Sequence, residues 1–166
     1  MPVAGADSPM PPDRRHDFHH LPPASRASPA VTAHWLVKSE PDAFSWDQQV
    51  AVGVEPWTGV RNALAARNLR EMRLGDLAFF YHSNEGREIV GIVEVAREAY
   101  PDPTEESGRW CCVDMRALRS VPRRVTLAAM KAEPRLEGLA LIRQSRLSVV
   151  PVSPAHWAVL SEMAGL

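Results

Sequence analysis

WLVKSEPD, residues 35–42, changes within eight positions from an apolar run to a compact block of charged, hydroxyl and proline residues. The apolar half has the pattern of a buried β-strand. The polar half predicts a helix that begins near Pro41 and continues through Val50, with Ser39 or Asp42 available to cap its free amides. This stretch therefore places several polar side chains at the end of a buried strand.

The same change from a dry interior to short polar side chains occurs near three other element ends: LAFFYHSNEG (77–86), PWTGVRN (56–62) and IRQSR (142–146). If these ends converge with the first, they frame a cavity with an aromatic wall and a ring of hydroxyl and amide groups. A nucleobase needs this combination, because its faces stack on aromatic rings while its edge needs directional donors and acceptors. The pattern predicts a pocket for a flat ligand with polar edges.

The remaining patterns predict an α+β fold. Residues 60–72 have the apolar spacing of a helix, and shorter helices are expected near 127–131 and 154–163. Further strands are expected at 89–100, 110–118, 120–126 and 146–152. Pro122 favours an edge position for the strand that contains it. Five or six strands that rarely alternate with helices favour a curved mixed sheet or a small β-barrel with peripheral helices.

Composition limits the classes of partner. The 19 Lys and Arg residues against 20 Asp and Glu residues give a net charge of −1, so any nucleic acid must be held by local chemistry. The adjacent cysteines Cys111 and Cys112 point to opposite faces of a strand, which argues against a disulfide and favours a reducing, cytoplasmic setting. No apolar run has the roughly 20 residues that a membrane span needs. We expect a soluble protein without a membrane partner.

Residues 1–32 differ from the rest of the chain, because they hold seven of its 15 prolines. Such a segment buries too little apolar surface to offset its ordering entropy, so we expect a disordered arm before one domain at 33–166. A start site assigned too far upstream is an alternative explanation. The arm's three histidines lack a fixed frame for a metal, and its three aspartates do not suit a transit peptide.

Several motifs together resemble those of the EVE domain family: WLVKSEPDAFS, PWTGVRN, GDLAFFYHSN, GIVEVAREAYPDP and RLSVVPV. The resemblance extends from residue 34 to about residue 158. It implies a PUA-like fold, related to the YTH and ASCH domains. It also implies a pocket of the kind that relatives use for modified nucleobases, including modified cytosines in DNA.

The resemblance further implies which residues border that pocket. Carried across by motif position, the base-binding residues are Lys38, Ser39, Glu40, Trp57, Asn62, Tyr81, His82, Ser83, Gln144 and Ser145. Two features depart from the family pattern. Thr58 stands where family members often carry an acidic residue, and the insert TEESG at 104–108 is short. Either change could alter ligand preference without changing the fold.

Each aromatic or capping residue also has a structural interpretation. Trp35 alternates with apolar neighbours and is expected in the core. Trp57 stands in a loop, where a large aromatic side chain has less reason to be core, so it is the preferred stacking residue. Ser39 and Asn62 lie near helix starts and could cap a helix, contact the ligand, or do both. Glu40 could pair with Lys38 or an arginine and only fix its loop.

His82 raises the question of catalysis, because histidine is the commonest general acid or base. On a strand, however, His82 and Ser83 point to opposite faces, and no nucleophile turn of the GxSxG type is present. Catalysis is therefore disfavoured. A hydrogen bond into the pocket and a purely structural role remain open for His82.

The arginines near the predicted rim also have two interpretations. Arg61, Arg67, Arg143 and Arg146 could contact phosphates beside the pocket, or form an ordinary solvated surface. Salt separates the two, because binding through phosphates weakens steeply as salt rises.

The leading hypothesis is a non-enzymatic module that recognises a modified nucleobase, in DNA or RNA or as the free base, without a metal or another cofactor. Trp57 or Tyr81 would stack on the base, and its edge would be read by the four residues Ser39, Asn62, Ser83 and Gln144. The alternative is an enzyme or sensor that acts on a nucleobase-like small molecule in the same pocket. No zinc-deaminase signature, P-loop or dinucleotide-binding turn supports the enzyme. The sequence leaves the oligomeric state open.

Overall fold

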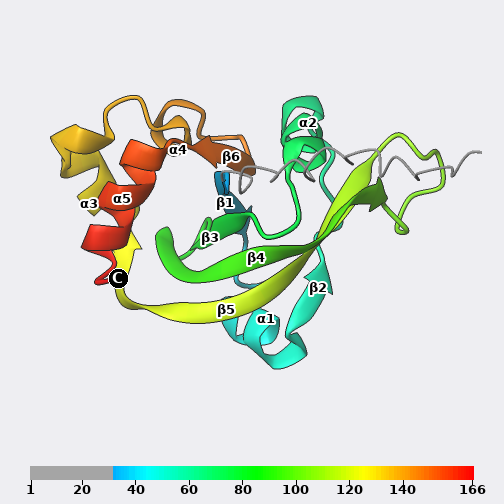
Figure 1. Ribbon diagram of the computed structural model, residues 1–166, viewed down its shortest axis with the longest axis horizontal. Coiled ribbons are helices and arrows are strands. Elements are labelled where there is room, and N and C mark those ends of the chain that lie inside the picture. The colour runs from blue at the N-terminus through cyan, green and yellow to red at the C-terminus, as the bar shows by residue number, and fades with distance from the viewer. Residues whose placement is uncertain (1–31) are drawn as a thin grey trace, which may run out of the picture. The chain divides into compact units, whose positions relative to one another are not determined.

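The computed structural model describes residues 32–166, so the predicted disordered arm lies outside the described residues except for its last residue. The six strands are β1 (His34–Ser39), β2 (Val54–Pro56), β3 (Leu77–His82), β4 (Glu88–Pro101), β5 (Cys111–Thr126) and β6 (Val149–Val152). The helices are α1 (Trp46–Val52), α2 (Ala63–Glu71), α3 (Leu127–Ala132), α4 (Ala140–Arg143) and α5 (Pro154–Met163), with a 3-10 turn η1 (Pro134–Leu136). The predicted α+β class is confirmed (Figure 1).

The strands form one mixed sheet in the order β2-β5-β4-β3-β1-β6. Only the pair β1 and β3 is parallel, and it places Lys38 beside Tyr81 and Ser39 beside His82. The other pairs are antiparallel. Between residues 32 and 166 no pairing joins β2 to β6, so the sheet is open and mixed rather than closed into a barrel. The parallel pair brings the polar ends of two strands to the same edge of the sheet.

The strand predicted at 120–126 is not separate, because it is the second half of the long strand β5. Its pairing with β4 shifts between Ser120 and Val125, and the residues between them have no partner in the ladder. β2, on the other side of β5, reaches only as far as Arg116. Pro122 therefore sits where no ladder hydrogen bond is needed, which is how a long strand accommodates proline.

The first helix begins later than the sequence pattern predicts. Ser45, not Ser39 or Asp42, is the N-cap of α1, in a capping box with Gln48. The Ser45 hydroxyl accepts from the Gln48 amide at 3.2 Å, and the Gln48 side chain accepts from the Ser45 amide at 2.8 Å. The Ser39 hydroxyl instead donates to the carbonyl of Phe44 at 2.5 Å. Reciprocal capping satisfies two free amides at once and so determines where the helix starts.

The core lies on and around the centre of the sheet. Trp35 is buried, as expected, and its indole nitrogen donates to the Asp76 carboxylate at 3.1 Å. Trp46 packs over Gly91, where a Cβ would lie 2.3 Å from the indole ring. Cys111 and Cys112 are both buried and free, as expected. Among residues 32–166 no helix is long and apolar enough to cross a bilayer.

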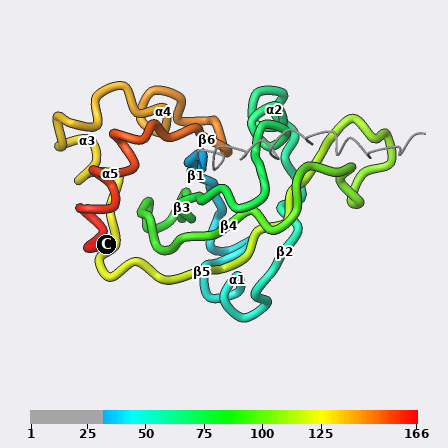
Figure 2. The backbone as a smooth tube through the Cα atoms, viewed as in Figure 1, coloured from blue at the N-terminus to red at the C-terminus, as the bar shows by residue number. Residues whose placement is uncertain are grey.

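The helices cover different parts of the sheet. α2 packs on β4, β5 and β6, and the Asn68 amide on α2 donates to the carbonyl of Val149 in β6 at 2.8 Å. The segment between β5 and β6 forms α3, η1 and α4, and α5, which follows β6, lies beside them (Figure 1, Figure 2). This segment returns the chain to β6 beside β1. The sequence between α4 and β6 is thereby brought next to the polar end of β1, where Lys38 bonds the carbonyl of Ser145.

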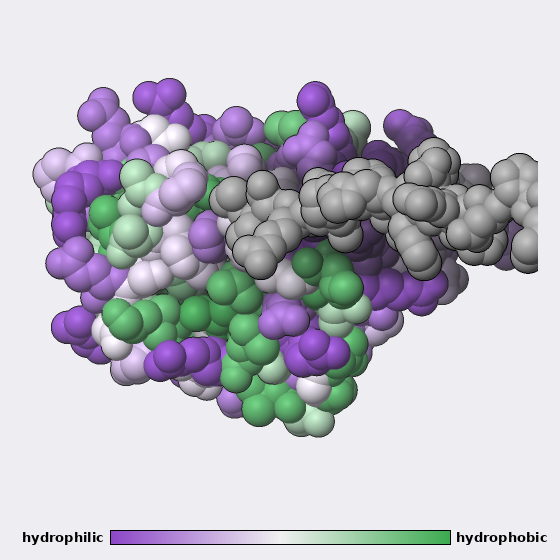
Figure 3. Space-filling view, in the orientation of Figure 1, coloured by the Kyte–Doolittle hydropathy of each residue, from purple (hydrophilic) through white to green (hydrophobic). Residues whose placement is uncertain are grey.

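Exposed apolar side chains gather at the opposite strand edge, around α1 and β2. Val50, Val52, Val54 and Leu118 are each more than 40% exposed. The face shown in Figure 3 carries a hydrophobic area over this lower part of the molecule. None of these four residues lines the cavity described below.

Candidate functional site

A cavity of about 600 Å³ opens at the end of β1. Its walls come from three segments: the end of β1 with the following turn (38–44), β2 with the loop that leads to α2 (55–62), and Ser148 before β6. Its charged groups are balanced, since Lys38 and Arg61 face Glu40 and Glu55. This volume lies within the range typical of small-molecule sites in proteins. The sequence predicted three of these four charged groups as site residues, and Glu55 was missed.

The aromatic wall of the cavity is Trp57 together with Phe44. Trp57 is only 8% exposed, so it belongs to the core as well as to the cavity, although its loop position suggested otherwise. Its ring meets Phe80 edge-on at 5.6 Å between centroids and Phe44 at 6.5 Å. Its backbone amide donates to the carbonyl of Val113 at 2.7 Å. These contacts fix the indole before any ligand enters.

The loop from Trp57 to Asn62 is held by the buried carboxylate of Asp102, which the sequence did not single out. Asp102 accepts from the Gly59 amide at 2.9 Å, from the Arg61 guanidinium at 2.9 Å, and from the amide and hydroxyl of Thr104 at 2.8 and 2.6 Å. Burial by itself would raise the pKa of Asp102, but these hydrogen bonds outweigh it and hold the pKa well below its usual range. The sequence feature that marks Asp102 is the YPDP segment (100–103), in which the aspartate stands between two prolines.

Asn62 acts as a helix cap. Its side-chain oxygen accepts from the Ala65 amide at 3.0 Å, which makes it the N-cap of α2. Asn62 also lines the cavity, so the capping interpretation holds and the ligand role stays a prediction. The cap fixes the end of the loop that carries Trp57.

The rim at the end of β1 is formed by Lys38, Ser39 and Glu40. The Lys38 ammonium donates to the carbonyl of Ser145 at 3.0 Å, and burial lowers the pKa of Lys38. Within the described part of the chain Glu40 forms no ion pair with Lys38 or with an arginine. The predicted pairing of Glu40 is therefore absent there. The backbone carbonyl of Glu40, not its carboxylate, holds the turn by accepting from Ala43 and Phe44.

Most of the other predicted residues lie in two hollows that adjoin the cavity. The turn hollow is lined by Lys38, Tyr81, Ser83, Asn84, Arg87, Lys131 and Ser145, with two leucines. The arginine hollow is lined by Asn62, Arg143, Gln144, Ser145 and Arg146, with two leucines. Lys38 belongs to both the cavity and the turn hollow, and Asn62 to both the cavity and the arginine hollow. The predicted residues other than His82 and Arg67 therefore surround three adjoining depressions rather than one slot.

His82 lines none of the three depressions. Its Nε2 accepts from the backbone amide of Trp46 at 3.0 Å, which ties the start of α1 to the end of β3. Burial and the nearby Arg124 cation lower the pKa of His82, and Glu88 and Asp47 only partly oppose them. This geometry corresponds to the structural interpretation of His82 rather than to a pocket contact.

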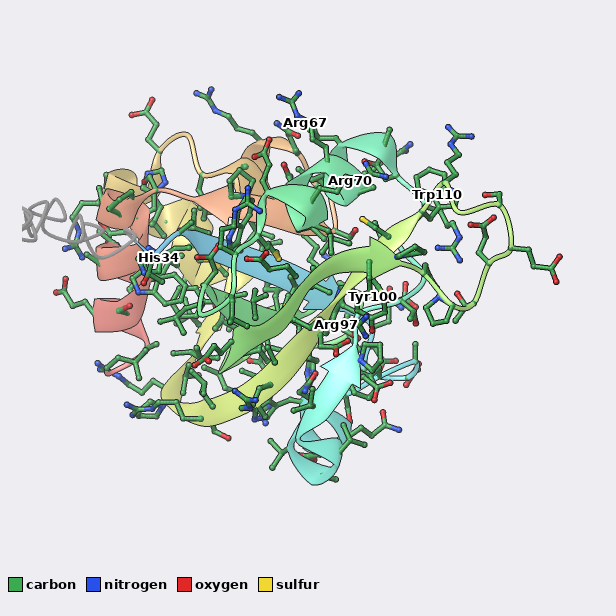
Figure 4. All side chains as sticks on the ribbon, turned by 45° about the vertical axis from the view of Figure 1, so that its right-hand side comes forward. His34, Arg67, Arg70, Arg97, Tyr100 and Trp110 are labelled. Carbon is green, nitrogen blue, oxygen red and sulfur yellow. The ribbon has the colours of Figure 1, made fainter. Side chains whose placement is uncertain are left out.

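The four predicted phosphate contacts are in different situations. Arg61 is engaged by Asp102 and donates to the Thr104 hydroxyl at 3.1 Å. Arg67 projects from α2 (Figure 4), forms an ion pair with Glu71 at 3.4 Å, and lines neither hollow. Arg143 and Arg146 line the arginine hollow. Among residues 32–166 no group of three His, Cys, Asp or Glu side chains could hold a metal ion.

Comparison with known proteins identifies the relatives of this chain. The sequence profile of the EVE domain matches residues 33–163. Human thymocyte nuclear protein 1 is 32% identical in an alignment of length 157 that covers 74% of this chain and 70% of that protein. An NMR structure of a protein from Rhodopseudomonas palustris is 58% identical with a TM-score of 0.77, over 81% of this chain and 94% of that one. A crystal structure of human thymocyte nuclear protein 1 in complex with DNA that contains 5-methylcytosine is 30% identical with a TM-score of 0.76, over 81% and 99%.

Proposed function

The chain belongs to the EVE domain family, and on that premise we propose that it is a non-enzymatic module that binds a modified cytosine of DNA in the cavity at the end of β1. The observation that carries the proposal is the cavity itself, which joins a fixed indole to charged donors and acceptors on a fold shared with a relative solved with 5-methylcytosine DNA. We favour binding over catalysis because His82, the best candidate for proton transfer, is engaged by the backbone of α1.

The groups of the cavity match the edge of cytosine. Cytosine presents one amino donor, and protein carboxylates commonly accept from that amino group. Glu55 and Glu40 supply carboxylates, and Lys38 supplies a donor for the acceptors of the base. Trp57 and Phe44 provide apolar surface against which the ring and its added methyl group lie. Thymine carries the same methyl group but has the O4 acceptor in place of the amino donor, so a carboxylate that accepts from that amino group would face an acceptor instead.

A base in duplex DNA must leave the stack before it enters this cavity. Flipping costs a few kcal/mol and is easiest for a base that is mismatched or already single-stranded. We therefore expect tighter binding to single-stranded or mismatched DNA than to a fully paired duplex. Trp57, which is immobilised by Phe80 before binding, reduces the entropy lost when the base arrives.

Isothermal titration with three oligonucleotides tests the proposal. The strands differ only in the central base, which is 5-methylcytosine, cytosine or thymine. We expect 5-methylcytosine to bind best, and to bind better than thymine by about tenfold, because a correct pair of edge contacts is worth about 1 to 3 kcal/mol. Equal affinity for the three strands would contradict the proposal.

The variant Glu55→Gln identifies the reading group. Replacing the carboxylate with an amide should reduce the preference for 5-methylcytosine over thymine while leaving the fold intact. Glu106→Gln is the matched control, since Glu106 is exposed and lines none of the three depressions. A preference that survives in Glu55→Gln would move the reading role to Glu40.

A further inference from the structure

The net charge of −1 conceals a local excess of positive charge beside the cavity. The turn hollow contains three cations, Lys38, Arg87 and Lys131, and no carboxylate of residues 32–166 lines it. The arginine hollow contains Arg143 and Arg146, again without a carboxylate. Between residues 32 and 166 none of these five side chains forms an ion pair.

The cations of the turn hollow are placed by the backbone. Asn84 and Arg87 both have positive φ, at 68° and 45°, in the turn between β3 and β4. Left-handed backbone costs a residue with a side chain roughly 1 to 2 kcal/mol, so the surroundings must hold it. The amide of Leu127 does so by donating to the carbonyl of Arg87 at 2.8 Å. This bond sets Arg87 next to α3, whose Lys131 lines the same hollow.

The hydrogen bonds of these cations do not neutralise their charge. The Lys38 ammonium donates to the carbonyl of Ser145 at 3.0 Å, and the Arg87 guanidinium donates to the carbonyl of Asn84 at 3.3 Å. A carbonyl carries no net charge, so an anion in the hollow would still be attracted. Hydroxyl and amide groups of Tyr81, Ser83 and Asn84 lie in the same hollow and can donate to phosphate oxygens.

The two hollows adjoin each other and the cavity through shared lining residues. Ser145 lines both hollows, Lys38 joins the turn hollow to the cavity, and Asn62 joins the arginine hollow to the cavity. We propose that the DNA strand whose base enters the cavity lies across Ser145, with one backbone phosphate in each hollow. This inference rests on the proposed function and extends it to the backbone. It assigns phosphate contacts to Arg87 and Lys131, which the sequence did not indicate. Arg67 lies outside this phosphate track, the row of cations along the two hollows.

Binding measurements on the double variant Arg87→Gln/Lys131→Gln test the track. Its affinity for a single strand of about 12 nucleotides with one central 5-methylcytosine should fall on the order of tenfold at low salt. The slope of log affinity against log salt should become shallower by about 0.7, because single strands release about 0.7 counterion per phosphate contact and the turn hollow holds one phosphate. Affinity for the free nucleoside 5-methyldeoxycytidine should not change, and the corresponding nucleoside 5′-monophosphate reports whether one free phosphate is enough.

The matched control is Arg109→Gln/Arg119→Gln, which removes the same charge from two exposed residues that line none of the depressions. It should leave the salt slope close to that of the unaltered protein. An unchanged slope in Arg87→Gln/Lys131→Gln, or an equal change in the control, would overturn the track and leave the proposed base pocket standing. If the unaltered protein showed no preference for 5-methylcytosine over cytosine and thymine, the proposed function itself would be overturned.

Discussion

The cavity and the two hollows beside it are built in different ways. The cavity is shaped by buried, engaged groups: behind its loop Asp102 accepts four hydrogen bonds, Trp57 is packed against two aromatic rings, and the charges that line the cavity are balanced. The hollows are lined by cations, exposed except for the half-buried Lys38, that form no ion pairs between residues 32 and 166. Buried engaged groups provide a fixed shape, and exposed cations provide attraction that salt can screen. On the proposed function, the cavity would then select the base and the hollows would attract the DNA backbone.

The largest expected effect is that of Asp102→Asn. An amide in place of this buried carboxylate cannot satisfy the same donors and loses the charge opposite Arg61, so the free energy of unfolding should fall by about 3 kcal/mol. The loop that carries Trp57 should loosen. The affinity for the free nucleoside should then fall more than the part of DNA binding that comes from phosphate contacts. Urea unfolding and nucleoside titration measure the two effects.

Acid titration adds a second measurement of Asp102. Since its folded pKa is depressed, its contribution to stability is present above the unfolded value of about 3.9 and is lost as pH falls toward the folded pKa. Asp102→Asn should therefore lose less stability than the unaltered protein below about pH 5. Asp42→Asn, at an exposed aspartate that lines none of the depressions, is the control. Equal acid sensitivity in the two variants would contradict this role of Asp102.

A smaller effect, confined to stability, is expected for Gly91→Ala. The added Cβ would lie 2.3 Å from the Trp46 ring, which is also held by the Ser120 hydroxyl at 2.8 Å. Overpacking of this kind costs about 1 to 3 kcal/mol. Because no residue of the cavity is touched, the folded variant should keep its preference for 5-methylcytosine over thymine. A lost preference would show that the shape of the cavity depends on the packing under α1.

The smallest effect is expected for His82→Gln and appears in the pH dependence of stability. The folded pKa of His82 is lowered, so its contribution to stability is complete above the unfolded value of about 6.5 and is lost as pH falls through the folded pKa. Glutamine can accept from the Trp46 amide without titrating. Thermal unfolding between about pH 5 and 7 should then depend less on pH in the variant than in the unaltered protein. Base binding at neutral pH should be the same in both, and a large loss there would return His82 to the site.

Long periodic segments were predictable from the sequence. β1, β3, α2 and α5 were expected close to where they lie, because each has a clear apolar pattern or cap. The three-residue strand β2 and the four-residue helix α4 were missed, since segments so short leave no periodicity to detect. The start of α1 was misplaced because Ser39, Asp42 and Ser45 all suit an N-cap. Only the geometry of Gln48 distinguishes among them.

The sequence by itself determined the class of fold, the family resemblance and the kinds of side chain at the strand ends. Only the tertiary structure decided which of those side chains share a depression. Asp102 reaches Gly59 across 43 residues, and Lys38 reaches Ser145 across 107 residues. Local patterns report the propensity of neighbouring residues, whereas such contacts depend on strand order and loop paths that close only when the whole sheet has formed.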